Sequence, residues 1–146
     1  LEIVGLSAFR QVGEAQVLWD GVYTKTDRPV LLLGIATDQA GGHDEEGQVI
    51  THRYYWREML RNRSADRGAG NAIGGVMGDW LDAWWPAGEP YHHASVYALG
   101  RRGVDELSWE AEHRGICRHG DGHQSPFLSQ LRKVYGVYRD ELWRLP

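Results

Sequence analysis

The sequence predicts a small α/β (α+β) domain in which a central antiparallel sheet, made of a hairpin plus one further strand, is flanked by helices. Residues 16–36 combine an alternating segment with a continuous apolar run, which is typical of a β-hairpin. Residues 51–64 and 104–116 gather their apolar side chains on one arc of a helix. Residues 91–99 form a short segment of β-favouring residues after a proline-containing turn.

Length and composition predict a single domain over residues 1–146. The chain has 146 residues, of which 42% are hydrophobic and seven are tryptophan, so it can bury a sizeable core. There is no apolar run near the length of a membrane span and no leader-like start, so we expect a cytoplasmic protein that does not insert into membranes. A single cysteine, Cys117, excludes an internal disulfide and thiolate zinc clusters within one chain. A homo-oligomer is compatible with the sequence.

The charge of the chain argues against a simple electrostatic binder of nucleic acid. The formal net charge is -4 and the pI is about 6.0, whereas such binders are usually basic. Almost all of the positive residues are arginines, however, because Lys25 and Lys133 are the only lysines. These arginines cluster, and the local field at a surface matters more than the total charge.

The predicted hairpin occupies residues 16–36. Side chains alternate as far as Tyr23, a polar break follows at 25–29, and an apolar run then ends at Gly34. Pro29 fits only the turn or the first strand position, since it has no N–H for a central ladder. Taken alone, the segment is an ordinary core hairpin.

Residues 51–64 predict a helix with a core face and a cationic face. The cationic face carries a row at i, i+4 and i+8, formed by Arg53, Arg57 and Arg61. Such a row repels itself unless an anion lies opposite. Two interpretations are open, namely contact with phosphate and a solvated face partly neutralised by Glu58 and by the acidic loop at 39–47.

The next two segments predict a core helix and a strand. Residues 71–84 carry an unbroken helical stripe of apolar side chains, which begins at the possible N-cap Asn71 and stops at Pro86. The strand at 91–99 begins with His92 and His93. Neighbouring strand residues point to opposite faces, so these histidines are not expected to hold one ion together.

Glu112 is the carboxylate that the residue pattern itself selects. In a helix over 104–116 it falls inside the apolar arc, whereas Glu110 falls outside. A buried carboxylate needs a metal, a cation or a donor to offset its desolvation. The alternative is a glutamate at the edge of the arc that pairs with a nearby arginine.

The remaining segments predict simple connections. Residues 1–15 are expected to form a lead-in strand or a short helix, and residues 117–124 a glycine-broken loop. Ser125 and Pro126 are typical of a helix start, and the last helix is expected to extend to about Arg144.

The chain resembles the GIY-YIG nuclease family over residues 16–128. Gly21, Val22 and Tyr23 match the first half of its signature, and Gly34 stands where the glycine of the second half belongs. Leu32 stands where a tyrosine is expected, so the second half is degenerate. The predicted order of hairpin, helix, helix, strand and helix also agrees with the fold of that family.

The resemblance implies a metal-dependent endonuclease that hydrolyses DNA. Glu112, in a Glu-x-Glu pattern with Glu110, would hold one Mg²⁺ or Mn²⁺ ion at the scissile phosphate. Arg53 and Arg57 would neutralise the phosphate oxygens, with His52 beside them.

The resemblance further implies that Tyr23 is the general base for the attacking water, which a phenol can be only next to cations. His52, His92 or His93 would replace the missing tyrosine. Residues expected to contact the substrate are Gly34, Arg61, His92, His93 and Gln124. We expect Tyr23, the arginines and Glu112 to converge on one shallow site.

Two other functions stay open. One is a binding module for nucleic acid or protein that has the same fold with an eroded catalytic set. The other is a cysteine hydrolase that pairs Cys117 with His92 or His93.

Overall fold

The computed structural model describes residues 2–7, 15–35, 45–63, 68–82, 114–119 and 129–144. It divides into two compact units. The first unit consists of Leu1–Thr37 and Ile50–Gly78, and the second of Asp38–Val49 and Asp79–Pro146. Helices and strands are mixed, which confirms the α+β class. No helix in the described ranges has the length and apolar character needed to cross a membrane.

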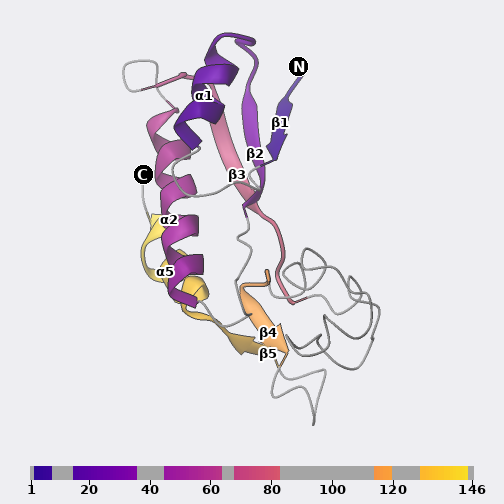
Figure 1. Cartoon of the computed structure of the whole chain (residues 1–146), viewed down its shortest axis with the longest axis vertical. Coiled ribbons are helices and arrows are strands. Elements are labelled where there is room, and N and C mark those ends of the chain that lie inside the picture. Colours follow the sequence, from indigo (N-terminus) through magenta and orange to yellow (C-terminus); the bar gives the residue numbers. More distant parts are fainter. Residues whose placement is uncertain are drawn as a thin grey trace, which may run out of the picture. The chain divides into compact units, whose positions relative to one another are not determined.

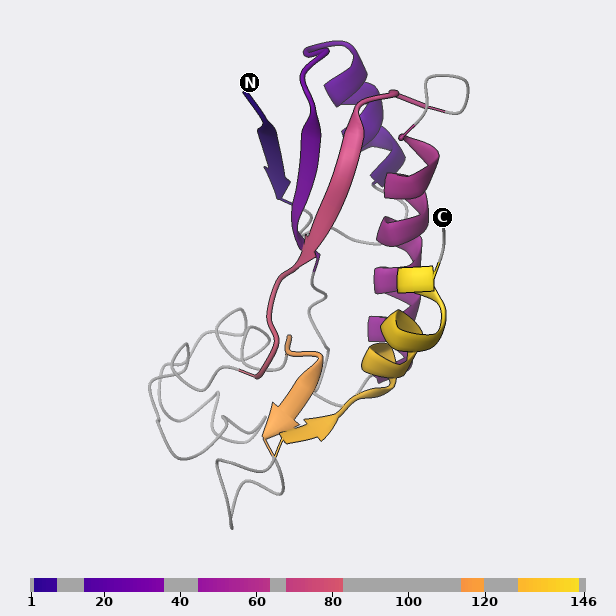
Figure 2. The same ribbon diagram turned by 180° about the vertical axis from the view of Figure 1, so that it is seen from behind.

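The sheet of the first unit is parallel (Figures 1 and 2). Its strands are β1 (Val4–Ser7), β2 (Val30–Ile35) and β3 (Ala72–Met77), in the order β1-β2-β3. Val30 of β2 pairs with Val4 of β1 on one side and Ala72 of β3 on the other. Parallel neighbours need a crossover, and helices supply both. Helix α1 (Ala15–Tyr23) joins β1 to β2, and helix α2 (Glu45–Arg61) lies between β2 and β3.

Both helices of the first unit cover the same face of this sheet. In Figure 1 helix α1 crosses in front of the strands, and α2 runs beside β3. Their buried side chains form one core with the strands, and its members include Trp19, Val22, Leu32, Tyr55, Met59 and Ala72. On the opposite face Leu33 and Ile73 are exposed. The fold is therefore two successive β-α-β crossovers around a one-sided core.

The predicted antiparallel hairpin at 16–36 is wrong. Its first half is helix α1, and its second half, β2, is parallel to both neighbouring strands. A strand would place Val17, Trp19 and Tyr23 on one face, but Trp19 is 2% exposed while Val17 is 67% and Tyr23 is 68% exposed. The buried positions Ala15, Trp19 and Val22 follow the helical period instead. The segment is short enough to fit both periods, and tertiary packing selects the helix.

The predicted core helix at 71–84 is also wrong where the structure describes it, because residues 72–77 form strand β3. A side chain on Gly75 would place its Cβ 3.1 Å from the Met59 sulfur, so glycine leaves room for the close packing between β3 and α2. Asn71 does not cap a helix. Its Nδ2 donates to the carbonyl oxygens of Thr26 (3.3 Å) and Arg28 (3.0 Å), which attaches the α1–β2 turn to the start of β3.

Two predictions for the first unit are confirmed. The lead-in contains a strand, β1, and residues 51–61 are helical. Helix α2 begins earlier than expected, at Glu45, so part of the acidic loop at 39–47 is helix. Acidic residues in a first turn interact favourably with the helix dipole, which explains the early start.

The second unit contains an antiparallel strand pair and a short helix. Strand β4 (Cys117–His119) pairs with β5 (Ser129–Leu131), and α5 (Lys133–Asp140) and the 3₁₀ helix η3 (Leu142–Arg144) follow. The loop expected at 117–124 is therefore a strand at its start, since Cys117 and Arg118 pair with Leu131 and Gln130.

The last predicted helix starts later than expected, at Lys133. Residues 129–131 form β5 instead, because they complete the ladder with β4. The described end of the predicted helix at 104–116, residues 114–116, is not helical. Residues 104–113 and the strand expected at 91–99 lie outside the described residues.

Candidate functional site: a pocket at the ends of α1 and α2

The structure describes some of the predicted site residues and not others. Glu112, His92, His93 and Gln124 lie outside the described residues, so their predicted roles stay predictions. Those that are described all belong to the first unit, namely Tyr23, Gly34, His52, Arg53, Arg57 and Arg61.

A pocket of about 190 Å³ brings two of these residues together. Tyr23 comes from the end of α1 and Arg61 from the end of α2. The rest of the lining consists of Trp19, Asp20, Glu58, Asn62, Gly68 and Ala69. The pocket thus collects aromatic, acidic, basic and amide side chains in a single hollow.

Asn62 builds one wall of this pocket. It follows α2 directly, is almost fully buried, and donates from Nδ2 to the carbonyl oxygen of Glu58 at 2.8 Å. Its Oδ1 accepts a hydrogen bond from the Ala69 N–H at 2.8 Å. An added Cβ on Gly68 would lie 2.4 Å from Asn62 Oδ1, so only glycine fits this approach. The asparagine therefore holds residues 68 and 69 against the end of α2.

The charged groups in the pocket are two carboxylates and one guanidinium. Asp20 is exposed on α1, while the Glu58 side chain is 17% exposed and its Oε1 lies 3.8 Å from Arg61 Nη1. Carboxylates are anionic and guanidinium is cationic at neutral pH. The lining consequently carries an excess of one negative charge.

Trp19 is a core residue that also borders the pocket. Its side chain is in the core, and its Nε1 is buried with no hydrogen-bond acceptor among the described residues. An indole N–H can only donate. A buried donor without an acceptor has a desolvation cost that lowers the stability of the fold.

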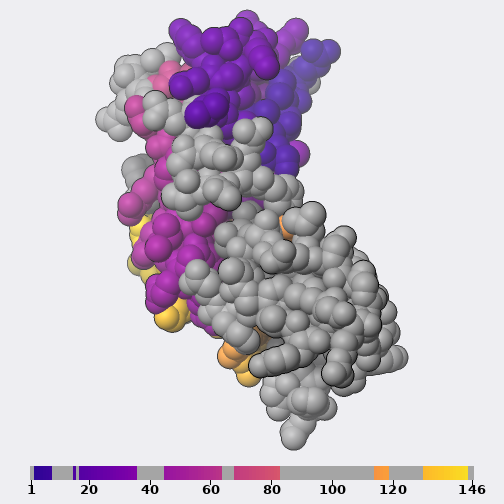
Figure 3. All heavy atoms as spheres, viewed as in Figure 1, coloured from indigo at the N-terminus to yellow at the C-terminus, as the bar shows by residue number. Residues whose placement is uncertain are grey.

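The arginine row lies on the predicted face of α2. Tyr55 and Met59 are buried, whereas Arg57 and Arg61 are exposed and Arg53 is partly buried. Helix α2 forms part of the surface visible in Figure 3. At 1.5 Å per residue, the row from Arg53 to Arg61 extends about 12 Å along the helix. The predicted helical phase is confirmed.

His52 does not share that surface. It is 1% exposed, and burial lowers its pKa to about 4. The imidazole is therefore neutral near pH 7, and it is buried although it is next to Arg53 in the sequence. Gly34 has a positive φ of 65° within β2 and does not line the pocket.

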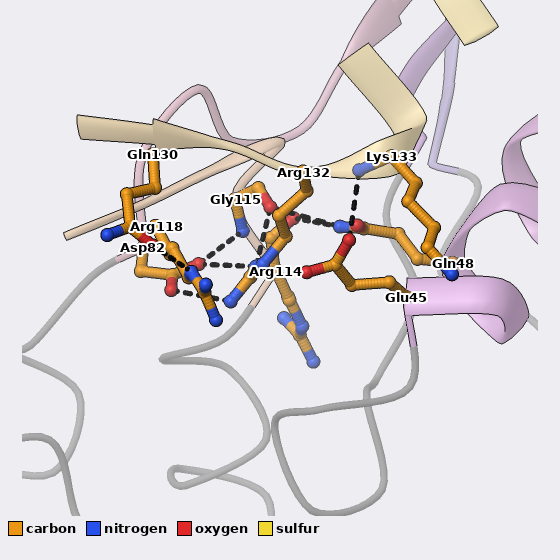
Figure 4. A network of polar contacts seen from close by, with 9 residues as sticks. All are labelled: Glu45, Gln48, Asp82, Arg114, Gly115, Arg118, Gln130, Arg132 and Lys133. Atoms are coloured by element: carbon orange, nitrogen blue, oxygen red, sulfur yellow. Dashed lines mark hydrogen bonds and ion pairs between the residues drawn. The ribbon is translucent and has the colours of Figure 1, made fainter. Parts of the chain in front are cut away.

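A buried ion pair organises the second unit (Figure 4). Arg132 donates from Nη1 and Nη2 to the two carboxylate oxygens of Asp82, both at 2.7 Å, and from Nη1 also to the carbonyl oxygen of Gly115 at 2.7 Å. The Gly115 N–H donates to Asp82 Oδ1 at 3.0 Å, and Gln48 Nε2 donates to the Gly115 carbonyl at 3.0 Å. Its central side chains, Asp82 and Arg132, are closed to solvent, and the network holds four segments together, those of Gln48, Asp82, Gly115 and Arg132. Sequence reasoning missed it, since no motif links Asp82 to Arg132.

Cys117 lies beside that network. The thiol is buried, and burial raises its pKa, an effect larger than that of the nearby Arg132 charge, which lowers it. A nucleophilic cysteine needs a lowered pKa. The geometry therefore gives no support to a cysteine hydrolase, and its expected partners His92 and His93 lie outside the described residues.

The acidic start of α2 meets the start of α5 in the second unit. Glu45 Oε2 accepts a hydrogen bond from the Lys133 N–H at 3.0 Å, and the Lys133 ammonium pairs with Glu46. The first N–H groups of a helix lack partners within the helix. Glu45 supplies one for α5, so these carboxylates have a structural use.

No cluster of three or more histidine, cysteine, aspartate or glutamate side chains suited to a metal ion occurs within the described part of the chain. Comparison of the chain with protein-family models, with curated proteins and with solved structures finds no match.

Proposed function

We propose that this protein binds nucleic acid by contacting its phosphates with the arginine row of α2. The observation that carries the proposal is the surface row itself, in which Arg53, Arg57 and Arg61 share one side of a helix whose other side is core. Arginine is the residue best suited to phosphate, because its planar guanidinium can donate two parallel hydrogen bonds.

The energetics of the row support an anionic partner. Like charges at i and i+4 destabilise a helix by about 0.2–0.5 kcal/mol per pair. Three guanidiniums on one side of α2 therefore repel one another, and contact with phosphate would offset that repulsion. Glu58, 3.8 Å from Arg61, offsets part of it as well.

Binding is favoured over family-type catalysis for a structural reason. The resemblance to GIY-YIG nucleases depends on Tyr23 lying on the first strand of a hairpin, and Tyr23 is the last residue of helix α1. Gly21 is likewise a helical residue and has nothing within 4 Å of the position that a Cβ would occupy. Gly21 and Tyr23, which match the family signature in sequence, therefore lie in a helix and not in the hairpin strand on which the resemblance depends.

Fluorescence anisotropy with labelled DNA at several salt concentrations tests the proposal. Arg53→Ala and Arg57→Ala should weaken binding about equally for all sequences, and each should reduce the slope of log affinity against log salt by about one. Arg61→Ala should have a smaller effect, because Glu58 already partly neutralises Arg61. Arg28→Ala is the matched control, since Arg28 is an exposed arginine of the same unit outside the row.

The proposal fails if the Arg53→Ala/Arg57→Ala double variant binds DNA with the affinity and salt dependence of the wild type. The row would then be a solvated helix face.

Metal-dependent endonuclease activity is a second candidate, which one observation favours. The pocket places two carboxylates, Asp20 and Glu58, with Arg61 and the phenol of Tyr23. Carboxylates with Mg²⁺ or Mn²⁺ and a nearby arginine are the usual means of stabilising a phosphodiester transition state. Mg²⁺-dependent nicking of supercoiled DNA tests this candidate, and Glu112→Gln should abolish it if Glu112 is the metal ligand.

A further inference from the structure

We propose that Trp80 and Trp143, both in the second unit, are stacking platforms for the bases of a single-stranded nucleic acid. The inference rests on the proposed function and deepens it, because it names the class of nucleic acid that the chain binds. The arginine row of α2 would contact phosphates, which single strands and duplexes share. An exposed indole ring instead contacts unpaired bases, so the two surfaces have different experimental signatures.

Both tryptophans expose about half of their surface. Trp80 is 53% and Trp143 is 50% exposed, whereas tryptophan side chains are highly buried on average. An indole ring has two flat faces, so a ring that is supported from one side and half exposed presents its other face to solvent. Exposed apolar surface of this kind marks a site of interaction.

A tyrosine of α5 supports each of the two rings. Trp80 meets Tyr135 edge-on, with ring centroids 6.1 Å apart and planes at 85°. Trp143 packs against the buried Tyr138, with centroids 5.5 Å apart and planes at 41°. The two tyrosines are three residues apart on one helix, which makes them neighbours on its surface. Helix α5 therefore supports both tryptophans.

The backbone at both tryptophans is held in place as well. The Trp80 carbonyl oxygen accepts a hydrogen bond from the Cys117 N–H at 2.9 Å. Trp143 belongs to the 3₁₀ helix η3, in which the preceding Leu142 is buried. A contact residue that is positioned before binding loses less conformational freedom when its ligand arrives. Both platforms are preorganised in this sense.

An arginine without an ion-pair partner among the described residues follows the second platform. This residue, Arg144, is exposed and comes directly after Trp143. The pKa of the Asp140 carboxyl is lowered mainly by the hydrogen bond from Arg139 and also by the charges of Arg139 and Arg144, so both guanidiniums lie near it. The other carboxylate of this turn, Glu141, is half-buried. The exposed charges beside the ring are therefore two guanidiniums and one carboxylate.

Planar rings next to an available guanidinium fit a single strand better than other partners. A phosphate beside a base stacked on Trp143 would meet Arg144, which can donate two parallel hydrogen bonds to it. In a duplex the bases are stacked on one another, and exposing one costs unstacking and unpairing energy. A neutral sugar can also lie flat on an indole, but it offers no anion to the guanidinium.

The first measurement compares two labelled oligonucleotides of equal length by fluorescence anisotropy with the full chain. One is an oligothymidylate and the other consists of abasic sites, so both carry the same phosphates and differ only in their bases. Wild type should bind the oligothymidylate about tenfold or more tightly, because stacking on an aromatic ring contributes about that much per base. Trp80→Ala and Trp143→Ala should each weaken binding of the oligothymidylate by about tenfold and leave that of the abasic probe unchanged.

Conservative variants separate stacking from simple apolar contact. Trp143→Phe keeps a flat ring and should retain most of the affinity for the oligothymidylate, whereas Trp143→Leu is apolar without a flat ring and should not. Ile73→Ala is the matched control, because Ile73 has the same exposed fraction as Trp80, 53%, but belongs to β3 of the first unit. Urea unfolding, compared among the variants, shows that each is folded.

Three results would overturn the platforms. The first is equal wild-type affinity for the oligothymidylate and the abasic probe. The second is a loss of duplex binding in the tryptophan variants as large as their loss of single-strand binding. The third is binding of a neutral glucan that Trp80→Ala or Trp143→Ala abolishes while neither changes the preference for bases, which would show a carbohydrate site instead.

Failure here and failure of the proposed function give different results. If wild type shows no preference for bases while Arg53→Ala and Arg57→Ala still flatten the salt dependence of binding, phosphate contact by the arginine row stands and the platforms do not. If the preference for bases depends on Trp80 and Trp143 while the arginine variants bind normally, the platforms stand and the row is a solvated helix face.

Discussion

Replacing Asp82 with asparagine should destabilise the protein by about 3–5 kcal/mol, because it leaves the Arg132 charge buried without its counter-ion. Both side chains of the pair are 2% exposed, so water cannot take the place of the carboxylate. The structure shows two hydrogen bonds of 2.7 Å between the guanidinium and the carboxylate, and the substitution removes the charge from both. Since whole domains are stable by about 5–15 kcal/mol, the expected loss is a large fraction of the total.

A double-mutant cycle separates the pair from the burial of each partner. Arg132→Met alone should also destabilise strongly, because it leaves Asp82 charged and leaves the Gly115 carbonyl with Gln48 as its remaining donor in this network. The double variant, Asp82→Asn with Arg132→Met, should lose less free energy of unfolding than the two single variants lose in sum. Buried ion pairs replaced on both sides are often close to neutral, whereas pairs broken on one side are not.

Urea unfolding followed by circular dichroism gives the free energy of each variant. The matched control is Arg139→Met with Asp140→Asn, which removes an ion pair of similar geometry that is exposed at the surface of α5, and it should leave the unfolding midpoint unchanged. If Asp82→Asn has the same urea midpoint of unfolding as the wild type, the expected destabilisation is wrong, because solvent must then reach the ion pair.

Three further results are expected. Burial lowers the pKa of His52 to about 4, below the ordinary value of about 6.5. The unfolded state therefore binds the proton more readily, so the contribution to stability is complete above about pH 6.5, and up to about 3 kcal/mol is lost as the pH falls toward 4. His52→Leu should remove this loss from urea midpoints measured at about pH 7 and about pH 4.5. Gly115→Ala should destabilise strongly, because the added Cβ would lie 2.3 Å from the backbone nitrogen of Asp82, whereas Gly136→Ala in α5 meets nothing within 4 Å and should raise the melting temperature. Gly21→Ala should stabilise α1 by up to about 1 kcal/mol, and a loss of stability instead would contradict the helical assignment.

The sequence was sufficient to predict α2 and its two faces. Its pattern runs through many turns, so the buried Tyr55 and Met59 and the exposed Arg57 separate clearly under a helical period and would not under a strand period. Long amphipathic segments are determined by their own periodicity, and the arginine row follows from that phase alone.

The sequence predicts the wrong secondary structure where the segments are short. The nine residues of α1 place Trp19 in the core under either period, and the exposure of Val17 is what distinguishes them. In β3 the apolar positions fit a helix, but glycine at position 75 allows a close approach to Met59 that only the assembled sheet makes visible. Whether these segments form a helix or a strand depends on packing against residues distant in the sequence, so the local residue pattern could not determine it.

The pocket could be anticipated only in part. The sequence predicts both Tyr23 and Arg61 as site residues, the first in a hairpin and the second in a phosphate-binding row, and it is the parallel topology that brings them to one pocket. The sequence does not point to Asp20, Glu58 or Trp19. An acidic residue on a helix is ordinarily a solvated surface group, and a core tryptophan gives no sign in the sequence that its N–H is without an acceptor.

The parallel topology also determines what this pocket can bind. Each helix leads back to the start of the following strand, so the ends of α1 and α2 face the edge where β2 and β3 begin. Ligands of parallel α/β sheets usually bind at the opposite edge, where strands end and helix N-termini attract anions. At the edge occupied here the helix ends are negative, and Arg61 alone cannot offset them together with Asp20 and Glu58. A bare phosphate group is therefore disfavoured at this edge of the sheet.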